Sequence, residues 1–225
     1  MNIIPGNKAT ASYALTESSC DAFFQSLCKR FDIWAPQRYS GRGRFSDTDS
    51  IGYGLVQSIR QIVFDEKSHF SPKEAVFPIS ETLFNLVEDE FRQPIEKAPK
   101  DLLLVARACD INAIERLDDI FLRNGQMPDP YYQARRERIR FLLLECSESF
   151  DNCFCVSMNT NKTDNYAGAI RRVDGRYFLQ ICDDDIGTHL PDDAVTSDFV
   201  PSFIEENRET IVPPDRETLG CVPQI

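Results

Sequence analysis

Cysteines are the residues of this chain best suited to metal or redox chemistry. The 225-residue sequence contains eight, and Cys146, Cys153 and Cys155 fall within one ten-residue stretch. Thiolates bind zinc and iron–sulfur clusters, and two thiols can form a disulfide. The spacing Cys-x6-Cys-x-Cys matches neither the Cys-x2-4-Cys knuckle of structural zinc sites nor the Cys-x2-Cys-x2-Cys run of ferredoxins. It favours a metal site over unligated cysteines or a redox-active disulfide, without choosing between zinc and a cluster.

A predicted βαβ unit would bring these cysteines together. The apolar runs at residues 101–106 and 140–146 read as buried strands, and the segment between them, 107–122, has helical periodicity. Cys109 follows the first strand and Cys146 closes the second, so both are expected at the carboxyl edge of one parallel sheet, whose strands lie about 4.8 Å apart. The loop with the other two cysteines starts at the same edge. Four sulfurs are therefore expected to converge where open α/β sheets place ligands.

The other predicted elements define the fold class. They are a helix from Thr16 to Arg30, extended chain at 31–39, a second helix over 49–64, a strand at 176–183 after an Asp-Gly turn, and a short helix over 197–207. The expected fold is α/β, with a mixed or mostly parallel sheet, flanking helices and a small helical N-terminal region. Three regions are expected: a helical one at 1–95, an α/β one at 96–185 that carries the cysteine site, and an acidic connector at 186–225.

Charge, hydropathy and motifs argue against several classes of protein. With 36 acidic and 25 basic residues, the formal net charge is −11, which argues against binding nucleic acid through its phosphates. No run approaches eighteen apolar residues, and the N-terminal segment lacks the features of a secretory signal, so we expect no membrane insertion and a cytoplasmic location. The hydrolase motifs Gly-x-Ser-x-Gly and His-Glu-x-x-His are absent.

Three further features have ordinary structural interpretations. The Gly/Arg loop at 41–44 has residues that can bind an anion but lacks the P-loop lysine, so a structural or subunit-contact role is favoured. His69 is expected to be a hydrogen-bonded structural residue. Lys73 and Glu74, in a Pro-Lys-Glu box, are expected to help frame the site rather than to catalyse.

Five segments, running in order from about residue 31 to about residue 181, carry a family resemblance. They include GRGRFSDTDSIGYG, HFSPKEAVFPISETLF, VARACDINAIERLDDIFL, DPYYQARRE and CxxxxxxCFCVSM. Together they resemble the A-subunit family of anaerobic sulfite reductases and, more broadly, the iron–sulfur β subunits of cytoplasmic sulfhydrogenases. The resemblance implies a relay: a flavoprotein reductase subunit oxidises NAD(P)H, the iron–sulfur subunit passes on single electrons, and a separate sirohaem subunit reduces sulfite. Such a chain is not catalytic alone.

The resemblance also implies a ligand set for a [4Fe–4S] cluster. The family's Arg-Ala-Cys-Asp falls on residues 107–110 and its Cys-Phe-Cys on 153–155. The implied ligands are Cys109, Cys146, Cys153 and Cys155. Asp110 has two interpretations: its carboxylate replaces one thiolate as an iron ligand, or it is the N-cap of a helix that begins at Ile111, a position that Asp favours.

The sequence departs from the family after the cysteine region. Family members continue into a ferredoxin-like module with two further cysteine runs, whereas the last residues here, ETLGCVPQI, contain only Cys221. We therefore expect a truncated or a short member, whose electrons leave through another chain or through the missing module. The alternative from a different class is a structural or docking module of a redox complex, with zinc or no metal at the cysteines.

Overall fold

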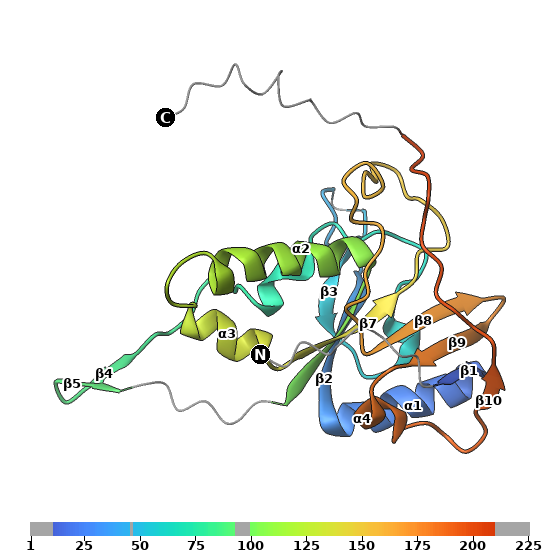
Figure 1. Ribbon diagram of the computed structural model, residues 1–225, viewed down its shortest axis with the longest axis horizontal. Coiled ribbons are helices and arrows are strands. Elements are labelled where there is room, and N and C mark those ends of the chain that lie inside the picture. The colour runs from blue at the N-terminus through green and yellow to red at the C-terminus, as the bar shows by residue number, and fades with distance from the viewer. Residues whose placement is uncertain (1–10, 46, 93–99, 210–225) are drawn as a thin grey trace.

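An eight-stranded mixed sheet forms the centre of the computed structural model, which describes residues 11–45, 47–92 and 100–209 (Figure 1). The spatial order of the strands is β10-β1-β9-β8-β7-β6-β2-β3. Their bounds are β1 Ala11–Leu15, β2 Phe31–Tyr39, β3 Ser50–Leu55, β6 Asp101–Ala106, β7 Ile139–Leu144, β8 Gly168–Val173, β9 Arg176–Ile181 and β10 Val195–Ser197. Strands β2, β6, β7 and β8 are parallel, and the other neighbours are antiparallel. The predicted α/β class is confirmed.

Helices flank this sheet, and a small hairpin projects from it (Figure 1). The α-helices are α1 Glu17–Arg30, α2 Ala108–Asp118, α3 Pro130–Arg136 and α4 Asp184–Gly187. Short 3-10 turns span Ile59–Gln61 and Pro72–Ala75, a π-helical turn spans Asp119–Arg123, and the hairpin consists of β4 Asn85–Val87 and β5 Glu90–Arg92. Within the described part of the chain, no helix has the length and apolar character needed to cross a membrane.

The central strands are buried on both faces, which explains their continuous apolar sequences. In β6, Leu103 and Val105 belong to the core beneath α1, whereas Leu104 and Ala106 belong to the core beneath α2. Successive side chains of a strand point to opposite faces, so both cores need apolar residues from the same strand. The predicted strand–helix–strand unit is confirmed, because β6 and β7 pair in parallel with Leu104 opposite Phe141.

The first helix forms as predicted from its capping residue and its apolar positions. The Thr16 hydroxyl accepts a hydrogen bond from the Ser19 amide at 3.2 Å, as an N-cap residue does. Phe23, Phe24 and Leu27 lie fully buried on one side of the helix. Burial of each such side chain contributes about 1.5–3 kcal/mol, so α1 is held mainly by its packing on the sheet.

Helix α2 begins three residues earlier than predicted, which corrects the capping interpretation of Asp110. The helix starts at Ala108, its N-cap is Arg107, and Asp110 lies in the first turn. The Asp110 carboxylate instead accepts a hydrogen bond from the Tyr53 hydroxyl at 3.0 Å. A carboxylate in a first helical turn still interacts favourably with the helix dipole, so Asp110 suits this position without being the cap.

The predicted helix over 49–64 is wrong, because β3 occupies its first part and pairs antiparallel with β2. Two glycines, each about 1 kcal/mol worse than alanine in a helix, explain the difference. Gly54 also leaves room for the side chains of the facing strand. A Cβ added there would lie 2.1 Å from Gln37 Nε2 and 2.2 Å from Tyr39 Oη. The glycines and the pairing of β3 with β2 therefore decide this segment, not helical periodicity.

The C-terminal part also differs from the prediction. The Asp-Gly turn before β9 is confirmed: Asp174 and Gly175 both have positive φ in the tight β8–β9 connection. The short helix predicted over 197–207 is wrong, since β10 pairs with β1 and the chain then continues without regular structure. The eight-stranded sheet thus takes strands from each of the three predicted regions. Cys221 and the rest of 210–225 lie outside the described residues.

Candidate metal centre

Three of the four predicted cysteines meet at the carboxyl edge of the parallel strands. Cys109 is the second residue of α2, which follows β6, and Cys146 lies two residues beyond the end of β7. Both line a cavity of about 30 Å³ together with Cys155 from the loop after β7. Thiols from two strand ends and one loop therefore face a single small space, as the βαβ prediction requires.

Cys153 lies in the same loop but does not line the cavity. Its amide donates to the Phe150 carbonyl at 3.2 Å in a turn in which Asn152 has a positive φ of 59°. The Cys153 thiol is nevertheless close enough to raise the pKa of Cys146, after the larger effect of burial. The loop would have to rotate for all four sulfurs to share one ligand.

Burial and mutual proximity oppose ionisation of the thiols in the metal-free protein. Burial raises the pKa of Cys109 to about 12, and the neighbouring Asp110 carboxylate and the Cys146 and Cys155 sulfurs act in the same direction. Burial also raises the pKa of Cys146, against the lowering effect of Arg107. Both thiols are therefore protonated at neutral pH, so metal binding would have to displace protons.

Arg107 brings a buried positive charge to the site. Only 4% of its surface is exposed. Its Nη1 donates to Cys146 Sγ at 3.3 Å, and its Nη2 donates to the carbonyls of Phe64 and Glu66 at 3.0 and 2.9 Å. The guanidinium also lies 4.5 Å from the centre of the Phe150 ring. The two carbonyls hold the guanidinium in place through Nη2, and its Nη1 is directed at the sulfur of Cys146.

A segment that the sequence analysis assigned to a connector closes the site. Residues 202–208, the C-terminal strap, line the cavity with Ser202, Phe203 and Ile204. The strap is attached by Ser202, whose hydroxyl lies 2.8 Å from Glu145 Oε1, and by the Ile204 carbonyl, which accepts from Asn161 Nδ2 at 2.7 Å. The apolar pair Phe203-Ile204 within an acidic stretch is the sequence signal that could have revealed it.

Asn207 joins the strap to the cysteine loop. Its Nδ2 donates to Cys155 Sγ at 3.5 Å and lies 3.3 Å from Ser149 Oγ. Its Oδ1 accepts from the Val156 amide at 3.0 Å. One amide side chain therefore contacts the loop on both sides of the cavity sulfur.

Asp110 lies beside the cavity without lining it. Burial raises the pKa of its carboxyl group, while the hydrogen bond from Tyr53 and the Ser71 hydroxyl oppose that rise. Tyr53 is itself held by the strand β3, so the carboxylate is directed toward β3. Of the two candidates for the fourth ligand, Cys109 faces the cavity and Asp110 faces Tyr53.

The residue types of the donor set, but not their present arrangement, suit an iron–sulfur group or zinc. Three thiols line one small cavity, Arg107 donates to one of them and Asn207 to another, and thiolates are the preferred ligands of both. The volume of about 30 Å³ admits a water or a single ion. Across the described ranges, no three His, Cys, Asp or Glu side chains are arranged so that they could hold a metal ion. A four-iron cluster would therefore need the loop at 147–160 to move outward.

The weaker sequence candidates lie apart from this cavity. His69 takes part in structure, since its Nδ1 accepts from the Ile51 amide at 3.0 Å and its own amide donates to the Ile51 carbonyl. A larger cavity of about 1040 Å³ between α2, α3 and residues 163–167 contains none of the cysteines. Its four arginines, Arg116, Arg123, Arg136 and Arg140, are each paired with a carboxylate. The cysteine cavity is therefore the best candidate site.

Sequence comparison relates this chain to one component of a hydrogenase-type complex. The chain is 29% identical over 139 residues to sulfhydrogenase 2 subunit beta of Pyrococcus furiosus, and the match covers 62% of this chain and 38% of that protein. No protein-family model and no solved structure matches the chain. The chain is thus a distant relative of a sulfhydrogenase β subunit and spans well under half of its length.

Proposed function

We propose that this chain is an iron–sulfur electron-transfer subunit of an oxidoreductase complex. The observation that carries the proposal is the convergence of Cys109, Cys146 and Cys155 on one cavity beside the buried Arg107. The similarity to a sulfhydrogenase β subunit supports the same role. A hydrolytic or nucleotide-binding site would not need three thiols, from α2 and from the loop after β7, that face one small cavity.

The finer form of the proposal rests on the sequence resemblance. The bound group is a [4Fe–4S] cluster held by the three cavity cysteines, with Cys153 supplied by the loop as the fourth ligand. When bound, the cluster would supply one-electron storage. On this proposal the chain would accept electrons, in the cytoplasm, from a flavoprotein subunit that oxidises NAD(P)H and deliver them to a sirohaem subunit that reduces sulfite. This chain contributes the ligands, the enclosure and the hydrogen bonds to sulfur that adjust the potential.

Metal and sulfide analysis after anaerobic purification tests this function. We expect about four iron and four acid-labile sulfide per chain, and absorption near 400 nm that dithionite bleaches. The variant Cys182→Ser is a matched control, because this thiol lies beyond β9, outside the cavity, and it should leave the iron content unchanged. Stoichiometric zinc without labile sulfide would contradict the proposal.

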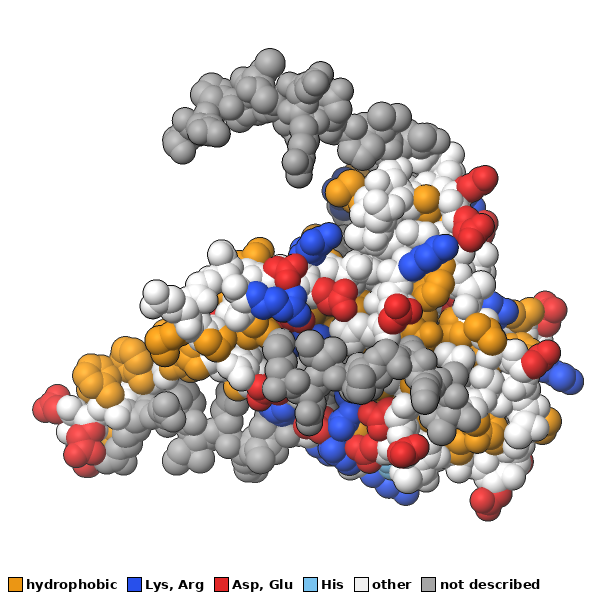
Figure 2. Space-filling model, viewed as in Figure 1, with side chains coloured by type: hydrophobic (Ala, Val, Ile, Leu, Met, Phe, Trp, Pro, Cys, Tyr) orange, Lys and Arg blue, Asp and Glu red, His pale blue; other side chains and the backbone are white. Residues whose placement is uncertain are grey.

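A docking module with zinc or no metal is the second candidate, and two observations favour it. The cavity admits one ion more readily than a cluster. In addition, the hairpin β4–β5 and the segment before it expose apolar side chains at the end of the molecule (Figure 2). Phe84, Leu86 and Phe91 are between 54% and 73% exposed, and exposed apolar groups of this kind mark protein contacts. The same metal analysis separates the two candidates.

A further inference from the structure

The hairpin β4–β5 has one apolar face and one mixed face. Leu86 and Phe91 lie opposite each other in the register, and the ring of Phe84 meets that of Phe91 edge-on, with the ring centres 4.8 Å apart. Residues two apart along a strand, and residues directly opposite on its neighbour, share a face of the sheet. The other two cross-strand pairs, which lie on the opposite face, each include a charged residue. The hairpin is therefore amphipathic, with three large apolar side chains together on one face.

This apolar face is open in the isolated chain. Phe84, Leu86 and Phe91 are each more than half exposed, and neither of the two buried cores of the described chain includes them. A two-stranded hairpin is marginally stable in water and needs further strands or a helix to pack against its apolar face. Exposed apolar side chains gathered in one patch mark a protein contact. The hairpin thus lacks the packing partner that its apolar face requires.

The tip of the hairpin is acidic. Glu88 and Asp89 form its two-residue turn, and Glu90 follows. Glu88 and Asp89 have positive φ values of 51° and 62°, a conformation for which such turns favour asparagine and glycine. All three side chains are exposed, and Figure 2 shows acidic side chains at the end of the row of apolar ones. A partner that covers the apolar face would meet this negative charge at its rim, which favours a partner with basic residues there.

The base of the hairpin is fixed to the body of the protein. The ring of Phe77 stacks on that of Phe121, which in turn stacks on Tyr132, with ring centres 5.0 and 4.9 Å apart. Glu81 forms an ion pair with Arg135 of α3. These contacts hold the segment that leads into β4, and the hairpin projects beyond α3, away from the sheet (Figure 1). Its apolar face is therefore presented to another molecule.

We propose that the apolar face of the hairpin β4–β5 binds a basic amphipathic helix of another protein chain. A helix suits this face better than an added strand, since each strand of the hairpin has only three residues and offers few backbone hydrogen bonds. A second copy of this chain is disfavoured, because it would bring another acidic tip and its own net charge of −11. The proposal goes beyond the electron-transfer role and is independent of it, since residues 84–92 contain no cysteine.

Binding of a synthetic helical peptide tests this proposal. The probe is a fluorescein-labelled peptide of leucine and lysine, about 15 residues long, with the leucines on one face. Fluorescence anisotropy with the full chain should show saturable binding, and hydrogen exchange in residues 84–92 should slow when the peptide is added. Leu86→Ser and Phe91→Ser should each weaken binding about tenfold, as truncation of a central apolar contact does. No binding by the parent protein, or equal binding by these variants, would overturn the proposal.

Matched variants separate this contact from nonspecific apolar or charge effects. Val195→Ser removes an exposed apolar side chain from the edge strand β10 and should leave binding unchanged. Asp89→Lys should weaken binding about fivefold, because it sets a positive charge against the lysines of the peptide. Asp174→Lys makes the same change in the β8–β9 turn, also at a positive φ, and should have a much smaller effect. If either control variant weakens binding as much as the hairpin variants do, the proposal is wrong.

Two further measurements test the choice of partner. A peptide with glutamate in place of lysine should bind much more weakly, and equal binding would overturn the assignment of a basic helix. Sedimentation at several concentrations tests a second copy as the partner: a dimer that Leu86→Ser converts to a monomer would assign the face to self-association instead.

The variants also keep this proposal separate from the proposed function. Circular dichroism should show the same fold in all of them, because every altered side chain is exposed. Their iron and sulfide content should equal that of the parent protein. Failure of peptide binding would therefore leave the electron-transfer role standing, and a parent protein without iron would leave the docking role standing.

Discussion

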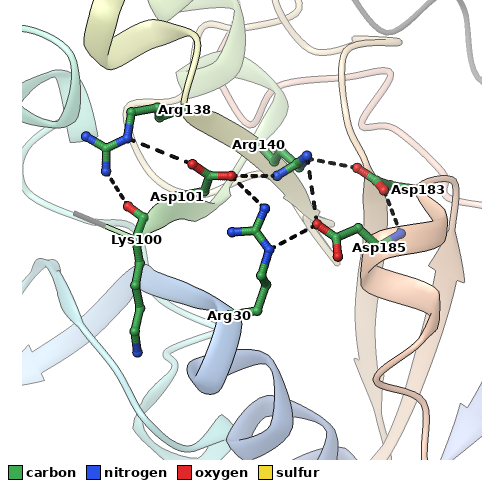
Figure 3. Close-up of polar contacts among 7 residues, drawn as sticks. All are labelled: Arg30, Lys100, Asp101, Arg138, Arg140, Asp183 and Asp185. Carbon is green, nitrogen blue, oxygen red and sulfur yellow. Dashed lines mark hydrogen bonds and ion pairs between the residues drawn. The ribbon is translucent and has the colours of Figure 1, made fainter. Parts of the chain in front are cut away.

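The two edges of the parallel sheet carry opposite kinds of polar chemistry. At the amino edge, side chains from α1, β6, β7 and α4 form a network of charges (Figure 3). Asp101 pairs with Arg30 at 2.9 Å and with Arg140 at 3.2 Å, and Arg140 also reaches Asp183 at 3.0 Å. At the carboxyl edge, thiols surround a cavity and the buried arginine faces sulfur. The charges of one edge are paired with one another, whereas the other edge has a cation that no carboxylate contacts among the described residues.

The difference indicates which edge is built for stability and which for a ligand. The network at the amino edge joins two helices to two strands. Its two central arginines, Arg30 and Arg140, also lie over the ring of Phe31. Each of these arginines faces a carboxylate. At the carboxyl edge, Arg107 contacts sulfur and backbone carbonyls, and an electron-rich group bound there would lower the cost of burying its charge. Substitutions at the two edges should therefore have separable effects.

Substitution of a cavity cysteine should give the largest effect, which is the loss of the bound group. We expect Cys109→Ser, Cys146→Ser and Cys155→Ser each to abolish the 400 nm absorption, because a hydroxyl is a poor replacement for a thiolate ligand. Iron and sulfide analysis on anaerobically purified protein is the measurement. We also expect Cys153→Ser to abolish the absorption, because in the proposed bound form the loop rotates and brings this thiol to the cluster.

The same variants should leave the amino edge intact. Their circular dichroism spectra should match that of the parent protein in its metal-free form. An unchanged chromophore in Cys153→Ser would remove Cys153 from the ligand set and make Asp110 the next candidate. Asp110→Asn would then test that role, with the Tyr53 hydrogen bond as the competing explanation.

At the amino edge, Asp101→Asn should lower stability without affecting metal content. Asp101 is the common partner of three arginines, and its side chain is 27% exposed. Its removal leaves cations close to one another, and we expect the free energy of unfolding to fall by about 1–3 kcal/mol. Urea denaturation at low and high salt is the measurement, and high salt should reduce the difference. The exposed Asp174 in the β8–β9 turn provides the control Asp174→Asn. Loss of iron at unchanged stability would contradict the distinction between the edges.

The sequence was most informative where one local pattern determined the structure. Buried parallel strands require continuous apolar runs, so the placement of Cys109 and Cys146 at one edge could be predicted from residues 101–146. The helix cap at Thr16 and the Asp174-Gly175 turn could be predicted equally well from the sequence, because each depends on the conformational preference of one or two residues. These patterns predicted the βαβ unit and three of the four cysteine positions relative to it.

Features that depend on distant contacts could not be predicted in this way. Strand β3 replaces a predicted helix because it pairs antiparallel with β2, a contact with another part of the chain. The strap returns to the cysteine loop through Asn207, and no periodicity in residues 202–208 signals that contact. Arg107 was part of a recognised motif, yet its orientation depends on the carbonyls of Phe64 and Glu66. Such pairings are set by tertiary packing rather than by local sequence.

A thiol that belongs to neither edge gives the smallest expected effect. Cys20 is fully buried in the core beneath α1, and burial, followed by the charge of Asp21, raises the pKa of its thiol well above its ordinary value of 9.0. A pKa raised in the folded state stabilises the fold below the unfolded-state pKa, and this contribution is lost as the pH rises above about 9.

Alkaline titration of stability can therefore test the contribution of the Cys20 thiol. At pH 9.5, the free energy of unfolding of the metal-free protein should be lower than at pH 8 by about 0.8 kcal/mol from Cys20 alone. Cys20→Ala should lack this part of the decline, although the smaller side chain lowers its stability at every pH. Urea denaturation at several pH values across this range measures how steeply the free energy of unfolding of each protein falls with pH.

The two possible outcomes decide whether the Cys20 thiol stays un-ionised in the folded protein. If both proteins lose the same amount of stability between pH 8 and pH 9.5, the pKa of Cys20 does not change on folding. The assignment of this thiol to the core as an un-ionised apolar group would then be wrong. If the stability of the parent protein falls more steeply with pH than that of Cys20→Ala, the thiol stays un-ionised in the folded core. Burial raises the pKa of both Cys20 and Cys146, but Asp21 adds to the rise at Cys20, whereas the N–H of Arg107 opposes it at Cys146.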